Sequence, residues 1–132
     1  MNDPVTSPAH YTAHPIEVIH LSRRLGAHLS QIVQYVMRAP LKGAELQDLR
    51  KALFYTDDLI ETMAKEQVRL ACMAEPDFTP SEFTWQMSDG RGRIVRMAWL
   101  AAWPREFALP TRLTHVRGAI AAEIALMERK ND

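Results

Sequence analysis

The sequence predicts an all-α protein, a compact bundle of five or six helices preceded by an extended N-terminal arm. Apolar residues recur at helical spacing in several separate segments, and proline and glycine residues divide those segments from one another. No stretch shows the strict alternation of apolar and polar residues that a half-buried strand requires. The 132 residues are enough for one domain with a modest core, so we expect residues 1–132 to form a single domain.

The N-terminal third predicts an arm followed by two helices. Residues 1–15 contain three prolines and no periodicity, so we expect an extended arm that lies on the domain. A first helix is expected to begin at Pro15 and to end at Gly26. A second helix is expected from about His28 to Met37, because apolar residues there have the spacing i, i+3, i+4, i+7. They are Leu29, Ile32, Val33 and Val36.

A long amphipathic helix is predicted from about Ala44 to Ala74, before Pro76. A helix of roughly 30 residues is about 45 Å long. The radius of gyration of a domain of this size is only about 14 Å. We therefore expect either a break near residues 62–65 or a partner chain that covers the far end. Together with the neutral net charge, this overhang favours a homo-oligomer.

The C-terminal part, residues 76–132, predicts three further helices. Thr79 and Glu82 have the spacing of a capping box and indicate the start of a short helix, which a turn at residues 89–92 should end. Residues 93–103 are expected to form a buried helix, with a strand at 94–97 as the alternative. A last helix is expected at about 111–130, with one apolar stripe made of Leu113, Val116, Ile120, Ile124 and Met127.

The charge balance argues against a general DNA-binding protein. Lys and Arg total 16 and Asp and Glu total 16, so the formal net charge is zero, whereas duplex-DNA binders usually carry an excess of basic residues. A minor alternative is an RNA or DNA contact through Arg91, Arg93 and Arg96. The neighbouring Trp85 and Trp99 are expected in the core, which weakens that alternative.

The sequence also predicts a cytoplasmic protein. No apolar run is long enough to span a membrane, and the polar, proline-containing N-terminus does not resemble a signal peptide. The lone Cys72 cannot form an internal disulfide, which fits a reducing compartment. Because Cys72 falls within the predicted long helix, we expect a buried and inert thiol.

Three cations near one helical hairpin predict an anion site. Arg38 ends one predicted helix, Lys42 lies in the following turn and Lys51 lies on the next helix. Arg offers a planar fork for phosphate oxygens and Lys a compact charge, while Tyr35 lies on the same helix face as Arg38. The alternative is structural, with charges at a helix end and a tyrosine in the core. The phosphate-binding sequence G-x-x-x-x-G-K-[ST] does not occur, so we expect no P-loop fold.

Metal binding is not the preferred interpretation of the carboxylates and histidines. Asp57, Asp58 and Glu61 lie on one predicted helix, and a solvated acidic face is preferred over a magnesium site. The first helix offers only Glu17, so a cage built from two helices is incomplete. His10 lies in the arm and is expected to be a surface imidazole.

Several short patterns carry a resemblance to a known family. They are His10-Tyr11, Ile16-Glu17, Tyr35-x-x-Arg38-Ala39, Lys42-Gly43 and Asp48-Leu49-x-Lys51-Ala52-x-x-Tyr55-x-Asp57-x-Leu59-Ile60. Over about residues 3–61 the chain resembles the small phage domain family typified by the T7-type nucleotide kinase. Much of that family is described only as a domain of unknown function. The resemblance implies a phage protein that binds nucleotides in the host cytoplasm, with residues 76–132 added.

The resemblance also implies roles for individual residues. As a nucleoside or deoxynucleoside monophosphate kinase, the protein would use ATP or another nucleotide as phosphate donor, with Mg²⁺ as an accompanying ion. The implied catalytic residues are Arg38, Lys42, Lys51, Glu17 and Asp57, and the implied nucleotide-binding residues are His10, Tyr11, Gln31, Gln34, Tyr35 and Tyr55. Gln31 and Gln34 stand where the family usually has Asn and Lys, and Pro40 where it has Gly. These differences favour the alternative, a non-catalytic protein that sequesters a nucleotide or binds a host protein.

Overall fold

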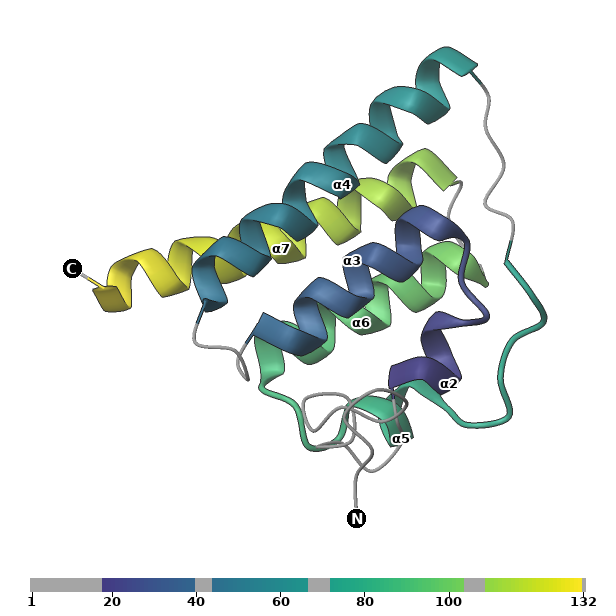
Figure 1. Cartoon of the computed structure of the whole chain (residues 1–132), viewed down its shortest axis with the longest axis horizontal. Helices are drawn as coiled ribbons and strands as arrows, with labels where there is room; N and C mark the ends of the chain where they lie inside the picture. The colour runs from purple at the N-terminus through teal and green to yellow at the C-terminus, as the bar shows by residue number, and fades with distance from the viewer. Residues whose placement is uncertain (1–17, 40–43, 67–71, 104–108, 132) are drawn as a thin grey trace.

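Helices make up most of the described chain (Figure 1). The computed structural model describes residues 18–39, 44–66, 72–103 and 109–131. Within these ranges lie α2 (Val18–Ser22), α3 (Ala27–Arg38), α4 (Glu45–Glu66), α5 (Pro80–Thr84), α6 (Asp89–Ala102) and α7 (Leu109–Asn131). No strand occurs among the described residues, so the prediction of an all-α fold is confirmed. The predicted arm, residues 1–15, lies outside the described residues.

The four longest helices pack in a closed ring. α3 packs against α4 and α6, and α7 packs against the same two helices from the other side. Figure 1 shows that α4 and α7 run in opposite directions and project past α3 and α6 at opposite ends of the molecule. The short helices α2 and α5 pack on α3 and α6, respectively. The core therefore lies between the four helices of the ring.

Four predictions about the helices are confirmed. The four apolar residues expected to face the core from α3 are buried, and so is the whole predicted stripe of α7, from Leu113 to Met127. Residues 94–97 are helical, which rules out the strand alternative. At the start of α5, Thr79 Oγ1 accepts a hydrogen bond from Glu82 N at 3.1 Å, and Glu82 Oε1 accepts one from Thr79 N at 3.0 Å. The predicted capping box is therefore present.

The predicted long helix is wrong in its C-terminal part. α4 ends at Glu66, and residues 72–78, which we name the strap, are not helical. The strap is fixed from two sides. The backbone N–H of Met73 donates to Arg24 O at 2.8 Å, while the indole of Trp99 donates to Glu75 Oε2 at 2.7 Å and that of Trp103 to Met73 O at 2.9 Å. Two of these bonds satisfy the backbone N–H and C=O of Met73, which a helix would have paired internally.

The expectation for Cys72 changes with the strap. Cys72 lies in this non-helical segment and is only partly buried. Its sulfur accepts a hydrogen bond from the backbone N–H of Gly26 at 3.3 Å. The predicted position inside a helix is therefore wrong, and the thiol instead joins the strap to the start of α3.

The predicted turn at residues 89–92 is also wrong, because these residues form the first turn of α6. Ser88 occupies the N-cap position with an extended backbone, and Asp89 supplies the negative charge favoured in a first helical turn. Gly90 allows α6 to approach α7 closely, since an added Cβ there would collide with the carboxylate of Glu123. Close helix packing, and not turn formation, explains this glycine.

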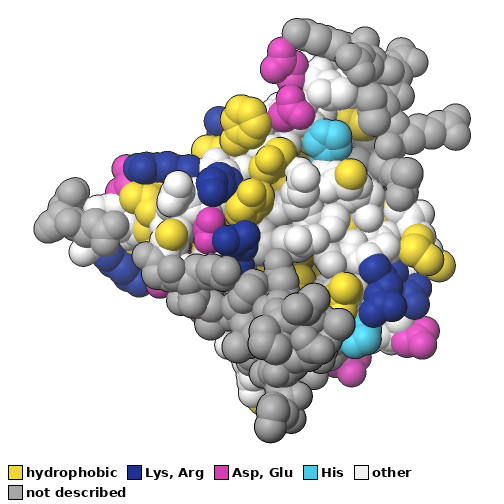
Figure 2. Space-filling model, in the orientation of Figure 1, with side chains coloured by type: hydrophobic (Ala, Val, Ile, Leu, Met, Phe, Trp, Pro, Cys, Tyr) yellow, Lys and Arg dark blue, Asp and Glu magenta, His cyan; other side chains and the backbone are white. Residues whose placement is uncertain are grey.

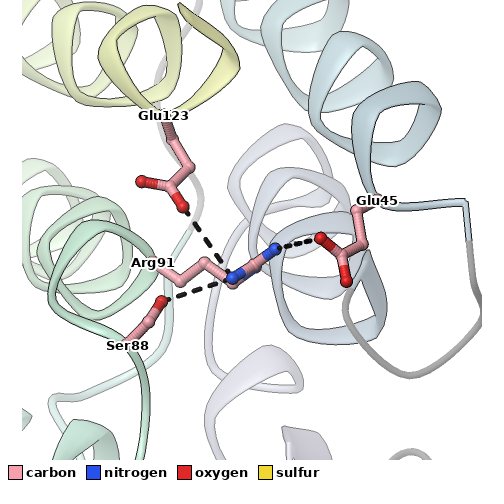
Figure 3. Close-up of polar contacts among 4 residues, drawn as sticks. All are labelled: Glu45, Ser88, Arg91 and Glu123. Atoms are coloured by element: carbon pink, nitrogen blue, oxygen red, sulfur yellow. Dashed lines mark hydrogen bonds and ion pairs between the residues drawn. The ribbon is translucent and has the colours of Figure 1, made fainter. Parts of the chain in front are cut away.

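Arg91 joins three helices through one buried guanidinium (Figure 3). Its Nη2 lies 3.3 Å from Glu45 Oε2 at the start of α4. Its Nη1 lies 3.8 Å from Glu123 Oε1 of α7 and donates to Ser88 Oγ at 3.3 Å. The side chain of Arg91 is only 10% exposed, so this network, which we name the Arg91 hub, is part of the core.

The arginine cluster considered for nucleic-acid binding is dispersed. Arg91 is buried in its hub, Arg93 is exposed, and Arg96 donates to Thr84 Oγ1 at 3.1 Å. Of the two tryptophans expected in the core, Trp99 is buried but Trp85 is 66% exposed, so the expectation for Trp85 is wrong. Trp85 is the C-cap residue of α5, a helix of only five residues, and its side chain lies outside the core.

The C-terminal end of α6 is capped from α7. Nη1 of Arg112 donates to the carbonyl oxygens of Leu100 and Ala101 at 3.1 and 3.0 Å. A cation at this position also suits the negative end of the helix dipole. Burial lowers the pKa of the Arg112 guanidinium from its usual value. In the part of the chain that the structure describes, no helix combines the length and the apolar character needed to span a membrane.

Candidate functional site

Two helices bring five polar and aromatic residues together along one edge of the bundle. Tyr35 and Arg38 come from the last turns of α3, and Asp48, Lys51 and Tyr55 from the first turns of α4. On each helix their spacing of three or four residues places the side chains on one face. We name these five residues the α3–α4 seam. Figure 2 shows Lys and Arg side chains beside hydrophobic ones over α3 and α4.

The ring of Tyr35 is the centre of the seam. The guanidinium carbon of Arg38 lies 5.6 Å and the Nζ of Lys51 lies 5.5 Å from the centroid of this ring. The rings of Tyr35 and Tyr55 stack with centroids 5.7 Å apart and an interplanar angle of 13°. Two of the three predicted cations, Arg38 and Lys51, therefore meet on one aromatic surface. The third, Lys42, lies outside the described residues.

Asp48 belongs to the seam, and the sequence reasoning missed its role. It is 3% exposed, and its Oδ2 lies 3.7 Å from Nε of Arg38. That separation is longer than a hydrogen bond, and neither atom has a hydrogen-bond partner among the described residues. The signal was available, since Asp48 adjoins the buried Leu49 and precedes the buried Ala52 by one turn of α4.

The remaining predicted site residues divide into three groups. Gln31 is exposed on α3, one turn before Tyr35. Gln34 donates to Ser30 Oγ at 2.9 Å and is held within α3. Asp57 lies on the other flank of α4, where its Oδ1 is 2.6 Å from Nε of Arg117. The structure therefore does not bring Asp57 together with Arg38 and Lys51. The other predicted residues, His10, Tyr11, Glu17 and Lys42, lie outside the described residues.

Two hollows lined by described residues lie elsewhere on the molecule. One, of about 430 Å³, lies between α6 and α7 and is mostly apolar. The other, of about 260 Å³, lies beside α2 and is lined by His20, Arg23, Arg24, Pro76, Asp77 and Phe78. Its two arginines make it a second place where an anion could bind. A binding experiment must therefore distinguish this hollow from the α3–α4 seam. Among the described residues, no group of three His, Cys, Asp or Glu side chains is arranged to hold a metal ion.

Comparison with known proteins indicates a family whose function is not described. The family model of a protein of unknown function (DUF3310) matches residues 5–57, less than half of the chain. No curated protein and no solved structure matches. The expected resemblance to a T7-type nucleotide kinase family is therefore corrected, because the matching family carries no such description. Residues 5–57 include α2, α3 and the first part of α4, and every residue of the α3–α4 seam lies within this match.

Proposed function

We propose that the protein binds a nucleotide at the α3–α4 seam. In this proposal the phosphate lies between Arg38 and Lys51, and the base extends the stack of Tyr35 and Tyr55. The observation that supports it most is the meeting of both cations on the Tyr35 ring, at 5.6 and 5.5 Å from its centroid. A ligand with a negative charge beside a flat aromatic group would satisfy both features at once.

The charges of the seam favour an anionic ligand. Asp48 balances one of the two cations, which leaves one positive charge in excess among the five residues. Arg38 is 33% exposed and Lys51 is exposed, so solvent reaches both and a ligand can do the same. Asp48 lies behind Arg38 and supports its orientation through charge alone, since their closest approach is 3.7 Å. The Nη atoms of the guanidinium, unlike its buried Nε, thus remain available to a phosphate.

The positions of the carboxylates favour binding over phosphoryl transfer. Asp57, the carboxylate expected to orient a reacting group, is engaged with Arg117 on the opposite flank of α4. Asp48 is nearly fully buried and faces Arg38. A general base must lie within hydrogen-bond reach of the proton it removes, and neither carboxylate is presented to a ligand in this way. Kinase activity stays a prediction.

Calorimetry with the full chain tests the proposal. Nucleoside mono-, di- and triphosphates and inorganic phosphate would each be titrated into the protein. Arg38→Ala should weaken nucleotide binding about tenfold or more, because a hydrogen bond to a charged group contributes about 1.5–3 kcal/mol. Arg129→Ala, an equally drastic change at an exposed position of α7, should leave the affinity unchanged. Equal affinities of these two variants would contradict the proposal.

A second pair of variants separates the seam from the hollow beside α2. Lys51→Ala should weaken binding, whereas its control Lys130→Ala, at an exposed position near the end of α7, should not. If Arg24→Ala abolishes binding while Lys51→Ala does not, the ligand lies in the hollow and the seam assignment is wrong. A coupled assay with ATP and each deoxynucleoside monophosphate tests the kinase prediction separately. Binding without turnover favours the non-catalytic protein.

A further inference from the structure

The outer surface of α4 carries a charge pattern that reverses about Phe54. Arg50 and Lys51 precede Phe54 by four and three residues, and Asp57 and Asp58 follow it by three and four. Phe54 itself is 66% exposed, an unusual position for a large apolar ring. The pattern therefore has an aromatic centre, a positive side and a negative side.

Phe54 lies on the crest of α4 that points away from the core. The opposite face of the helix is buried and consists of Leu49, Ala52, Thr56 and Leu59. On the flank toward α7, Arg50 lies 3.5 Å from Glu128, and Asp57 contacts Arg117. On the flank toward α3, Lys51 lies over Tyr35, and Asp58 lies 3.5 Å from His28. All four charges thus border the crest.

We propose that α4 of one chain packs antiparallel against α4 of a second copy, with the two Phe54 rings at the two-fold axis. Residues equally far from Phe54 on opposite sides then face each other. Arg50 and Lys51 of each chain therefore lie against Asp57 and Asp58 of the other. A two-fold interface must be complementary to itself. This pattern meets that condition, because the same contacts between basic and acidic side chains recur on both sides of the axis. Parallel packing would instead place like charges together.

The same features favour a second copy over an unrelated protein as the occupant. The complementary charges and the apolar centre are both present on this one helix, so no other sequence is needed to complete the interface. The zero net charge adds no repulsion between copies. The ion pairs that Arg50 and Asp57 make within the chain are about half exposed. Replacing these partners by residues of the second copy therefore costs little free energy. A contact through a single pair of helices should be small, with a dissociation constant on the order of micromolar.

Charge reversal and mixing provide the first test, by analytical ultracentrifugation of the full chain over a micromolar to submillimolar series. The wild type should dimerise. R50E/K51E and D57K/D58K should each be monomeric, because each places like charges across the axis. An equimolar mixture of the two variants should form a heterodimer that weakens as salt is added. Recovery of association in the mixture also shows that both variants are folded. A mixture that stays monomeric would overturn the proposal, and so would a monomeric wild type.

The aromatic centre provides the second test. Phe54→Ser should lower the dimer affinity at least tenfold. Trp85→Ser is the matched control, because Trp85 is also 66% exposed but lies at the end of α5. Dissociation of the dimer by Trp85→Ser but not by Phe54→Ser would place the interface elsewhere. The inference goes beyond nucleotide binding and stands without it, since sedimentation is measured with no ligand present.

Discussion

Arg38 and Arg91 each face a buried carboxylate, but their surroundings differ. The side chain of Arg91 is 10% exposed and is bound by Glu45 of α4, Glu123 of α7 and Ser88, the N-cap residue of α6. The side chain of Arg38 is 33% exposed and faces Asp48 at 3.7 Å, and among the described residues neither Nε nor Oδ2 has a hydrogen-bond partner. Nε of Arg91 lacks a hydrogen-bond partner as well, but both of its Nη atoms have one.

The difference separates a structural arginine from one that we propose to bind a ligand. Taking a charge out of water is costly unless several partners replace the water, and the Arg91 hub supplies them from within the protein. Among the described residues, Arg38 faces one carboxylate and its side chain is 33% exposed, so a ligand could reach its Nη donors. Burial and number of partners distinguish the two roles, although both residues are arginines paired with an acid.

Replacing the hub arginine should have the largest effect. Arg91→Met removes the partner of Glu123, whose side chain is only 6% exposed, and leaves a buried charge uncompensated. The free energy of unfolding should fall by about 3–5 kcal/mol. Urea unfolding followed by circular dichroism measures the change. Arg93→Met, at an exposed position of the same helix, should change it by no more than about 0.5 kcal/mol. Similar losses from both variants would remove the structural role assigned to Arg91.

Substitutions at two glycines test the packing around the Arg91 hub. A methyl group at Gly90 would displace the carboxylate of Glu123 from Arg91, so Gly90→Ala should destabilise the protein by about 1–3 kcal/mol. Gly118→Ala is the control, because nothing lies within 4 Å of an added Cβ there and alanine favours the helix. It should stabilise the protein by about 0.5–1 kcal/mol. Thermal unfolding should therefore shift in opposite directions for the two variants, and shifts of the same sign would be inconsistent with this packing.

The seam arginine should affect stability less than the hub arginine. Arg38→Met is expected to lower the free energy of unfolding by about 1–3 kcal/mol, because it leaves the buried Asp48 without this cation but breaks no hydrogen bond between the two side chains. A double-mutant cycle with Asp48→Asn should give a coupling energy below about 1 kcal/mol, whereas Arg91→Met with Glu123→Gln should give more. A larger coupling at Arg38 than at Arg91 would reverse the comparison and make Arg38 the structural residue.

The smallest effect is expected at Asp57. Its pair with Arg117 has both side chains about half exposed, so Asp57→Asn should cost less than about 1 kcal/mol, and less still at high salt. Because Asp57 lies on the other flank of α4, the same variant should bind nucleotide as tightly as the wild type in calorimetry. A clear loss of affinity for the nucleotide would instead indicate that Asp57 belongs to the binding site.

Periodicity was enough to predict most of the helices, because their apolar spacing determines which face is buried. It failed where tertiary contacts decide the local structure. The segment at 89–92 has the composition of a turn, but Ser88 begins a helix there and Gly90 serves the contact with α7. The strap continues an apolar pattern, but its backbone bonds to Arg24 and to Trp103 keep it out of a helix.

The candidate site was predictable only in part. Spacing along α3 and α4 placed Arg38 near Lys51, because only a short segment of sequence separates the two helices. Spacing could not distinguish Asp57 from Asp48, since both lie on α4 and only the packing of α7 shows that Asp57 turns toward Arg117. The burial of Asp48 could be predicted from its place beside Leu49 and one turn before Ala52, but its approach to Arg38 depends on the packing of α3 against α4.

The strap has a practical consequence for spectroscopy. Two of the three tryptophans in the chain, Trp99 and Trp103, donate their indole hydrogens to it, while Trp85 faces solvent. Loss of these bonds would change the polarity around two indoles at once. Intrinsic fluorescence, recorded with Trp85 replaced to remove its background, would then report detachment of this segment before the helices themselves unfold.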